Sequence, residues 1–216
     1  MFSEIPAYWT YSQQENAPCF VFAHGAGAPM DSPFMAYFAE AIAALGVNVM
    51  RFEFPYMDQR RISGKKRPPD RQPKLLECWE HMVQRLHAQQ KVILGGKSMG
   101  GRMATLLASN DSLPANVCGV ACLGYPFYAA GKRDKPRIEH LQTLTTPTCI
   151  VQGTRDSLGN KHHVQDYSLS PAVKIHWLAE ADHDLVPSKR SGFSKEAYWQ
   201  QAASWVAHFC HEVERY

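Results

Sequence analysis

Short apolar runs alternate with longer amphipathic patterns along this 216-residue chain, and this alternation restricts the fold more than any other feature. Runs such as 19–23 and 117–123 have the length and composition of buried strands, whereas apolar residues at 33–45 recur at helical spacing. Strands that alternate with helices predict a mostly parallel sheet with helices on both faces. We therefore expect an α/β protein that forms a single domain over residues 1–216.

The expected elements follow one another at short intervals along the chain. Strands are predicted at 19–23, 47–54, 91–95, 117–123, 148–152 and 173–178. Helices are predicted at 33–45, 75–86, 99–109 and along the apolar stripe from Trp199 to Val213. The polar, proline-containing segment 55–73 is predicted to be the longest loop, and the segment between 123 and 148 is too short for a cap domain.

Composition and charge exclude several classes of protein. A chain with 45% hydrophobic and 20% charged residues is typical of packed globular proteins. Its formal net charge of +3 is too small to indicate a nucleic-acid binder. No apolar stretch approaches the roughly 18 residues of a spanning helix, and residues 1–18 lack the basic and apolar segments of a signal peptide. We expect a cytoplasmic protein with neither nucleic-acid nor membrane partners.

The six cysteines do not form the pattern of a disulfide framework. They are scattered over a fairly long chain, and four of them, Cys19, Cys118, Cys122 and Cys149, fall in runs predicted to be buried strands. These positions favour free buried thiols.

A glycine-flanked serine follows the predicted strand 91–95. The sequence Gly96-Lys97-Ser98-Met99-Gly100 fits G-x-S-x-G, the sharp turn that carries a nucleophilic serine from a strand into a helix in α/β-hydrolases. The alternatives are an ordinary glycine-rich turn and the end of a phosphate-binding loop. The second is disfavoured, because its first glycine would fall at position 91, which is Lys91. Ser98 is therefore the candidate nucleophile.

The base and the acid are chosen by their position after later strands. In α/β-hydrolases the order is serine, acid, histidine, and each residue follows a strand. Of the ten histidines only His183 comes just after the last predicted strand, although a solvated surface histidine is the alternative. Asp156 ends a strand and a glycine turn, whereas Asp182 is too close in sequence to reach the ring of His183. We predict that Asp156 orients His183.

The first predicted strand ends in His24-Gly25-Ala26-Gly27, where the backbone can bend toward the serine. We predict the N–H groups of Ala26 and Met99 as donors to an oxyanion. His24 is assigned no chemistry, because it can simply brace this turn by hydrogen bonding. No metal site or cofactor is predicted, since the adjacent pair His162-His163 lacks the spacing of a coordination shell.

The predicted loop 55–73 is strongly basic. It carries Arg60, Arg61, Lys65, Lys66, Arg67 and Arg71 against Asp58 and Asp70, a formal balance of +4. Because it follows a parallel strand, we expect it at the same sheet edge as Ser98. Arg60, Arg61 and Arg67 are thus candidates to bind an anionic substrate, and a solvated loop is the alternative.

Longer runs resemble a known family. Six segments of the chain resemble motifs of small cap-less α/β-hydrolases. They are 23–34, Arg51-Phe52-Glu53-Phe54-Pro55-Tyr56, 95–102, Gly124-Tyr125-Pro126, 152–156 and Asp182-His183-Asp184. They are similar to the bacterial relatives of the testis-expressed protein 30 and NSL-complex subunit 3 group, which is distantly similar to dienelactone hydrolases. This resemblance implies an α/β-hydrolase sheet and the triad Ser98, Asp156 and His183. Some eukaryotic members of the group are associated with protein complexes, which implies an interaction role as the alternative.

These observations predict a serine hydrolase that cleaves a carboxylic ester or thioester of a small molecule. Ser98 would attack the carbonyl, His183 would move the proton, and Asp156 would hold the imidazolium. A serine nucleophile disfavours halide displacement and epoxide opening, which require a carboxylate in this fold. The alternative is a catalytically silent protein of the same fold that acts as an interaction module.

Overall fold

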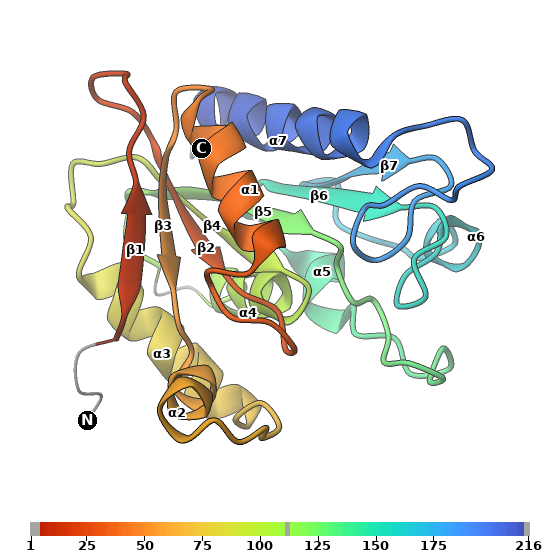
Figure 1. The fold of residues 1–216 in the computed structure, drawn as a ribbon, viewed down its shortest axis with the longest axis horizontal. Helices are drawn as coiled ribbons and strands as arrows, with labels where there is room; N and C mark the ends of the chain where they lie inside the picture. The colour runs from red at the N-terminus through yellow and green to blue at the C-terminus, as the bar shows by residue number, and fades with distance from the viewer. Residues whose placement is uncertain (1–4, 111–112, 214–216) are drawn as a thin grey trace.

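A seven-stranded sheet forms the centre of the computed structural model, which describes residues 5–110 and 113–213. The strand order is β1-β3-β2-β4-β5-β6-β7, and all neighbours are parallel except β1, which runs antiparallel to β3 (Figure 1). The strands are β1 (Ala7–Thr10), β2 (Cys19–Ala23), β3 (Asn48–Phe52), β4 (Val92–Lys97), β5 (Val117–Leu123), β6 (Thr148–Gly153) and β7 (Val173–Leu178). The six predicted strands are confirmed, with ends that move by two residues at most.

Helices cover both faces of this sheet, as predicted. They are α1 (Pro33–Ala43), α2 (Pro55–Ser63), α3 (Gln72–Gln84), α4 (Met99–Ala108), α5 (Glu139–Thr143), α6 (Lys161–Val164) and α7 (Lys195–Glu212). Helices α1 and α7 lie together on one face, and α3 and α4 lie on the other (Figure 1). Among the described residues only the short helix α5 interrupts the path from β5 to β6, so no cap domain is present.

Alternating side chains of the strands divide the core into two layers. In β2, Cys19 and Val21 pack with the layer under α3 and α4, whereas Phe20 and Phe22 pack with α1 and α7. Because successive strand residues point to opposite faces, a continuous apolar run of five buried residues supplies both layers.

The segment 55–73 is not a continuous loop, and this prediction was wrong. Its first half is helix α2, which starts with Pro55 at its first turn and ends at Gly64 in the left-handed conformation (φ 67°). Only Tyr56 and Met57 of α2 are buried, and most of its other residues are polar. The apolar periodicity that usually indicates a helix was therefore too weak to detect.

Strand β1 was also missed by the sequence analysis. It has four residues, none of them buried, and it pairs only with β3 at the edge of the sheet. A short edge strand with such exposure carries no alternating apolar pattern long enough to predict it.

The parallel strands bring their carboxyl ends to one edge. Ala23 lies beside Gly96, Lys97 beside Leu123, and Gly153 pairs with Leu178. The turns that follow β2, β4, β6 and β7 consequently start at one level, where ligands of open α/β sheets bind.

All six cysteines are free, and five of them are buried. Cys118 is partly exposed, which differs from the predicted full burial of the strand cysteines. Burial raises the pKa of Cys19 and Cys149 to about 12, so their thiols stay protonated at neutral pH. These groups belong to the core and not to a nucleophilic site.

Candidate active site

Ser98 occupies a strained turn between β4 and α4. Its backbone has φ 51° and ψ −114°, a conformation that costs a non-glycine residue on the order of 1–3 kcal/mol. The Ser98 N–H donates to the carbonyl of Leu123 at 3.1 Å, and the N–H of Arg102 donates to the Ser98 carbonyl at 3.0 Å. The surrounding hydrogen bonds thus fix the strand, the turn and the first helical turn around this residue.

Glycine is required on both sides of Ser98. A Cβ atom on Gly96 would lie 2.6 Å from the Ala23 carbonyl oxygen, and one on Gly100 would lie 2.5 Å from the same oxygen. Since this oxygen belongs to the neighbouring strand β2, it cannot move away without disturbing the sheet. The two glycines let α4 start directly against β2.

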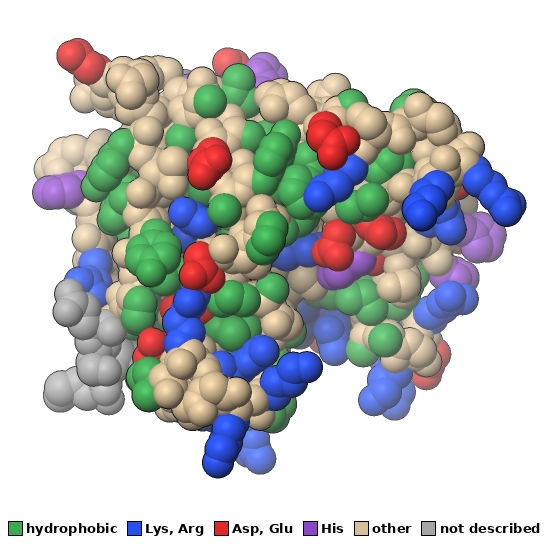
Figure 2. Space-filling model, in the orientation of Figure 1, with side chains coloured by type: hydrophobic (Ala, Val, Ile, Leu, Met, Phe, Trp, Pro, Cys, Tyr) green, Lys and Arg blue, Asp and Glu red, His purple; other side chains and the backbone are tan. Residues whose placement is uncertain are grey.

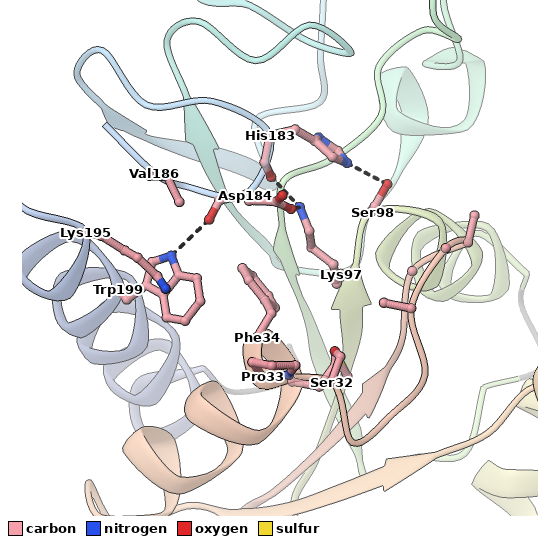
Figure 3. Close-up of a pocket in the computed structure, with 15 residues that line it drawn as sticks. Ser32, Pro33, Phe34, Lys97, Ser98, His183, Asp184, Val186, Lys195 and Trp199 are labelled. Carbon is pink, nitrogen blue, oxygen red and sulfur yellow. Dashed lines mark hydrogen bonds and ion pairs between the residues drawn. The ribbon is translucent and has the colours of Figure 1, made fainter. Parts of the chain in front are cut away.

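The structure brings together the three residues predicted to form a triad. The His183 Nε2 atom lies 2.8 Å from Ser98 Oγ (Figure 3). On the other side of the ring, His183 Nδ1 lies 2.7 Å from Asp156 Oδ2. The Asp156 side chain is fully buried, whereas that of His183 is 23% exposed. An Nδ1–H that donates to Asp156 leaves Nε2 as an acceptor for the Ser98 hydroxyl. This arrangement can activate a serine oxygen.

The buried carboxylate of Asp156 is held by several donors. Its Oδ1 accepts from the N–H of Leu158 at 2.7 Å, and its Oδ2 accepts from Gln152 Nε2 at 2.7 Å as well as facing His183. Gln152 is itself fully buried at the end of β6, where its Oε1 accepts from the N–H of Tyr125 at 2.7 Å. Gln152 was missed by the sequence analysis, although a polar residue inside a buried strand is a signal for such a role.

Asp182 does not contact His183 Nδ1. Its Oδ1 accepts from the N–H groups of Asp184 at 2.9 Å and Val186 at 3.0 Å. It braces the loop that carries His183 and does not hold the ring, which agrees with the prediction that Asp182 is too close in sequence to reach it.

Lys97 links the serine turn to the loop of His183. Its ammonium donates to the His183 carbonyl, pairs with the Asp184 carboxylate at 3.1 Å and lies 5.1 Å from the centre of the Phe34 ring (Figure 3). The side chain is only 10% exposed, and burial lowers the pKa of Lys97 while Asp184 opposes that shift. The sequence analysis assigned Lys97 no role, because it occupies a variable position of the motif.

The predicted oxyanion donors border Ser98. Ala26 and Met99 line the same cavity as Ser98, and Met99 is the first residue of α4, so its N–H has no acceptor within the helix. Tyr56 supports the Ala26 turn, because its hydroxyl lies 3.0 Å from the Ala26 carbonyl and 3.2 Å from that of Gly25.

His24 braces this turn, as predicted. Its Nδ1 lies 2.7 Å from the Gly25 carbonyl, and its Nε2 accepts from the N–H of Phe54 at 3.0 Å. The ring is completely buried, and this burial lowers the pKa of His24 to about 4. A neutral ring with its proton on Nδ1 satisfies both contacts.

Two cavities meet at Ser98 and Ala26, which line both. The first, the aromatic pocket, has a volume of about 760 Å³, and its distinctive wall residues are Pro33, Phe34, Val186, Lys195 and Trp199 (Figure 3). His183 also lines it. The second, the arginine pocket, has a volume of about 440 Å³ and is lined by Asp70, Gln72, Leu75, Met99, Arg102, Met103, Tyr128, Arg137 and Leu158, among others.

The basic side chains of 55–73 gather around α2, where Figure 2 shows them on the surface. Arg61 binds Glu53 at 2.8 Å and Asp31 at 2.6 Å, Arg60 donates to the Gly27 carbonyl at 3.4 Å, and Arg67 pairs with Asp70 at 3.3 Å. None of Arg60, Arg61 and Arg67 lines either cavity beside Ser98. The structure therefore does not bring these three predicted residues to the serine.

Two negative observations concern the part of the chain that the structure describes. Within 5–110 and 113–213, no group of three or more His, Cys, Asp or Glu side chains is placed to hold a metal ion. Within the same ranges, no helix combines the length and the apolar character needed to cross a membrane.

The parallel sheet, its helices and the serine turn after β4 define an α/β-hydrolase fold. The family model described as "Alpha/beta hydrolase domain" matches residues 16–211, and the chain belongs to this family.

Solved structures with this fold are similar over nearly the whole chain. A dienelactone hydrolase from Anabaena variabilis is 17% identical with a TM-score of 0.70, and the match covers 98% of this chain and 93% of that one. An esterase from Pyrococcus furiosus is 15% identical with a TM-score of 0.70 and coverages of 97% and 85%. An alpha-beta serine hydrolase homologue from Coxiella burnetii is 17% identical with a TM-score of 0.65 and coverages of 95% and 89%. At these identities the likeness establishes the fold.

Proposed function

We propose that this protein is a serine hydrolase that cleaves a carboxylic ester or thioester of a small molecule. The observation that carries the proposal is the continuous contact from Asp156 through His183 to Ser98 at a strained strand-to-helix turn. The family supports a hydrolase, and the named esterase and dienelactone hydrolase favour an ester among the possible substrates.

The reaction proceeds through an acyl-enzyme. Ser98 Oγ attacks the carbonyl carbon while His183 Nε2 takes the hydroxyl proton, and the N–H groups of Ala26 and Met99 stabilise the negative oxygen of the intermediate. His183 then gives the proton to the leaving oxygen or sulfur, whose bond to the carbonyl carbon breaks. Water repeats the sequence and releases the acid. Asp156 holds the ring of His183 and stabilises its charged form in both halves.

Lys97 positions His183 in this scheme. Its ammonium holds the carbonyl of His183, and the indole N–H of Trp199 donates to the Asp184 carbonyl at 2.9 Å, so the histidine loop is attached to β4 and α7 on its two sides. A ring fixed in this way needs less reorganisation when the proton moves.

The finer family assignment is also part of the proposal. We place the chain with the bacterial relatives of the testis-expressed protein 30 and NSL-complex subunit 3 group on the motifs around Ala26, Ser98 and His183. That group supplies the alternative function, an interaction module without turnover. The aligned triad favours turnover, because a pure interaction module has no need of a strained serine that faces a histidine.

Labelling with a fluorophosphonate probe tests the function, followed by a panel of esters and thioesters. The unmodified protein should react with the probe and should hydrolyse members of the panel, whereas Ser98→Ala should do neither. Ser109→Ala is the matched control, because this serine sits at the other end of α4 with its hydroxyl bonded to the Leu106 carbonyl. Equal labelling of Ser98→Ala and the unmodified protein would overturn the proposal, and absence of labelling from all three would favour the interaction module.

A further inference from the structure

Two arginines in the arginine pocket form no ion pair with any acidic side chain that the structure describes. Arg102 lies near the start of α4 and lines the arginine pocket together with Ser98, the residue that precedes this helix, and Arg137 reaches the pocket from the segment before α5. Among residues 5–110 and 113–213, neither arginine has a carboxylate oxygen within 4.0 Å. This differs from Arg61, which holds two carboxylates.

The two guanidinium groups also act on each other. Arg102 is largely withdrawn from solvent, and burial together with the like charge of Arg137 lowers the pKa of Arg102. Its Nη2 donates to Gln72 Oε1 at 3.2 Å, whereas its buried Nε has no hydrogen-bond partner among the described residues. A buried donor and two cations that repel one another are stabilised by an anion placed between them.

Asp70 is the one described acidic side chain in this pocket, and it is already neutralised. Its Oδ1 accepts from Arg67 at 3.3 Å and from Lys74 at 3.4 Å, both of which lie outside the lining of the pocket. Its Oδ2 is buried and has no partner among the described residues. The pocket and its immediate border therefore carry more positive than negative charge, and most of the remaining wall residues, including Leu75, Met103 and Leu158, are apolar.

The site geometry indicates which part of an ester would enter this pocket. His183, which hands the proton to the leaving group, lines the aromatic pocket and is not among the described residues that line the arginine pocket. The leaving group therefore points toward the aromatic pocket. The opposite, acyl side points toward Met99 and Arg102 in the arginine pocket.

We propose that Arg102 and Arg137 form a subsite for an anionic group at the far end of the acyl chain, so that the preferred substrate is an ester or thioester of a short dicarboxylic acid. Ser98, Arg102 and Arg137 line one cavity of about 440 Å³, so the chain that connects the carbonyl at Ser98 with the guanidinium groups is short. The apolar wall accommodates its methylene groups. This inference rests on the proposed function, and it deepens that function by naming the substrate class.

Two esters with one leaving group test the proposal: mono-4-nitrophenyl adipate and its neutral counterpart, 4-nitrophenyl methyl adipate. The unmodified protein should prefer the charged ester in kcat/KM by about tenfold to one-hundredfold, as expected for one or two charge-assisted hydrogen bonds. Arg137→Gln, which changes an exposed residue, and Arg102→Gln should each reduce the ratio of the two values by about tenfold. Arg133→Gln is the control for general charge effects, because it is exposed in the same segment and lines neither cavity at Ser98.

The outcomes separate this proposal from the proposed function. Hydrolysis of both esters with a ratio near one, or an equal change of the ratio in Arg133→Gln and Arg137→Gln, would overturn the anionic subsite and leave the hydrolase intact. If neither ester is hydrolysed, the proposed activity fails for this class, and calorimetry with monomethyl adipate and Ser98→Ala decides the subsite. Binding that is lost on adding Arg137→Gln would support it, and absence of binding would overturn it.

Discussion

Replacing Gln152 by leucine should destabilise the fold and disturb the triad at once. The amide is fully buried, accepts from the Tyr125 N–H at 2.7 Å, and lies within hydrogen-bond distance of Asp156 at 2.7 Å, the Gly159 carbonyl at 3.0 Å and the Tyr125 carbonyl at 3.1 Å. Leucine has a similar volume but removes every one of these polar contacts. The change thus isolates hydrogen bonding from packing.

The magnitude follows from the groups that lose their partner. The Tyr125 N–H is left buried without an acceptor, and at least one of the carbonyls and the Asp156 oxygen lose a donor; each such group costs about 1–3 kcal/mol. We expect the free energy of unfolding to fall by roughly 2–5 kcal/mol, a large share of the 5–15 kcal/mol typical of a domain. Since Asp156 also loses one of its fixing donors, kcat should fall in the folded fraction.

Urea unfolding followed by fluorescence measures the change, provided that the slope of the transition is the same in both proteins. Gln201→Leu is the control, because this glutamine is exposed on α7 and its replacement should change stability by no more than about 0.5 kcal/mol. A loss below about 1 kcal/mol for Gln152→Leu, with unchanged kcat, would show that the amide does not hold Asp156.

Three further predictions concern the acid, the lysine and the buried histidine. Asp156→Asn should reduce kcat on the order of 10⁴-fold by disturbing the tautomer of His183, whereas Asp182→Asn should have a much smaller effect, and the reverse order in ester kinetics would refute the acid assignment. Lys97→Met should reduce kcat more than it raises KM, because His183 loses its anchor, and Lys97→Arg should recover part of the loss; a change in KM alone would refute the positioning role. His24 has its pKa lowered to about 4 from 6.5 in the fold, so the unfolded chain binds a proton first as the pH falls through this window. The contribution of neutral His24 to the free energy of unfolding is fully present above about pH 6.5 and falls toward pH 4 by up to about 1.4 kcal/mol per pH unit. Urea unfolding at several pH values measures this change, and a stability that rises in acid would contradict the prediction.

Residues at the ends of buried strands were predictable from the sequence. The run before Ser98 and the run before Asp156 are apolar, short and followed by glycine, and parallel pairing brings such ends to one edge. The same reasoning selected His183 after the last strand. The positions of these residues therefore follow from local pattern combined with one rule of topology.

Contacts between distant side chains were not predictable in this way. Lys97 meets Asp184 across 87 positions of the chain, and Gln152 meets the Tyr125 N–H across 27, so neither contact leaves a periodic signal. The arginines show the same difficulty. Charge counting pointed to Arg60, Arg61 and Arg67, but only the packed structure reveals that these have partners, while Arg102 and Arg137 have no carboxylate beside them among the residues that the structure describes.

The backbone of Ser98 has a further consequence for how this chain evolves and is engineered. A left-handed φ of 51° suits glycine, which adopts it without the penalty that a side chain brings. At position 98, selection for stability alone would thus favour glycine over serine, and a serine is retained only while its hydroxyl is useful. Libraries that are screened for thermal tolerance without an activity screen would be expected to lose this hydroxyl early.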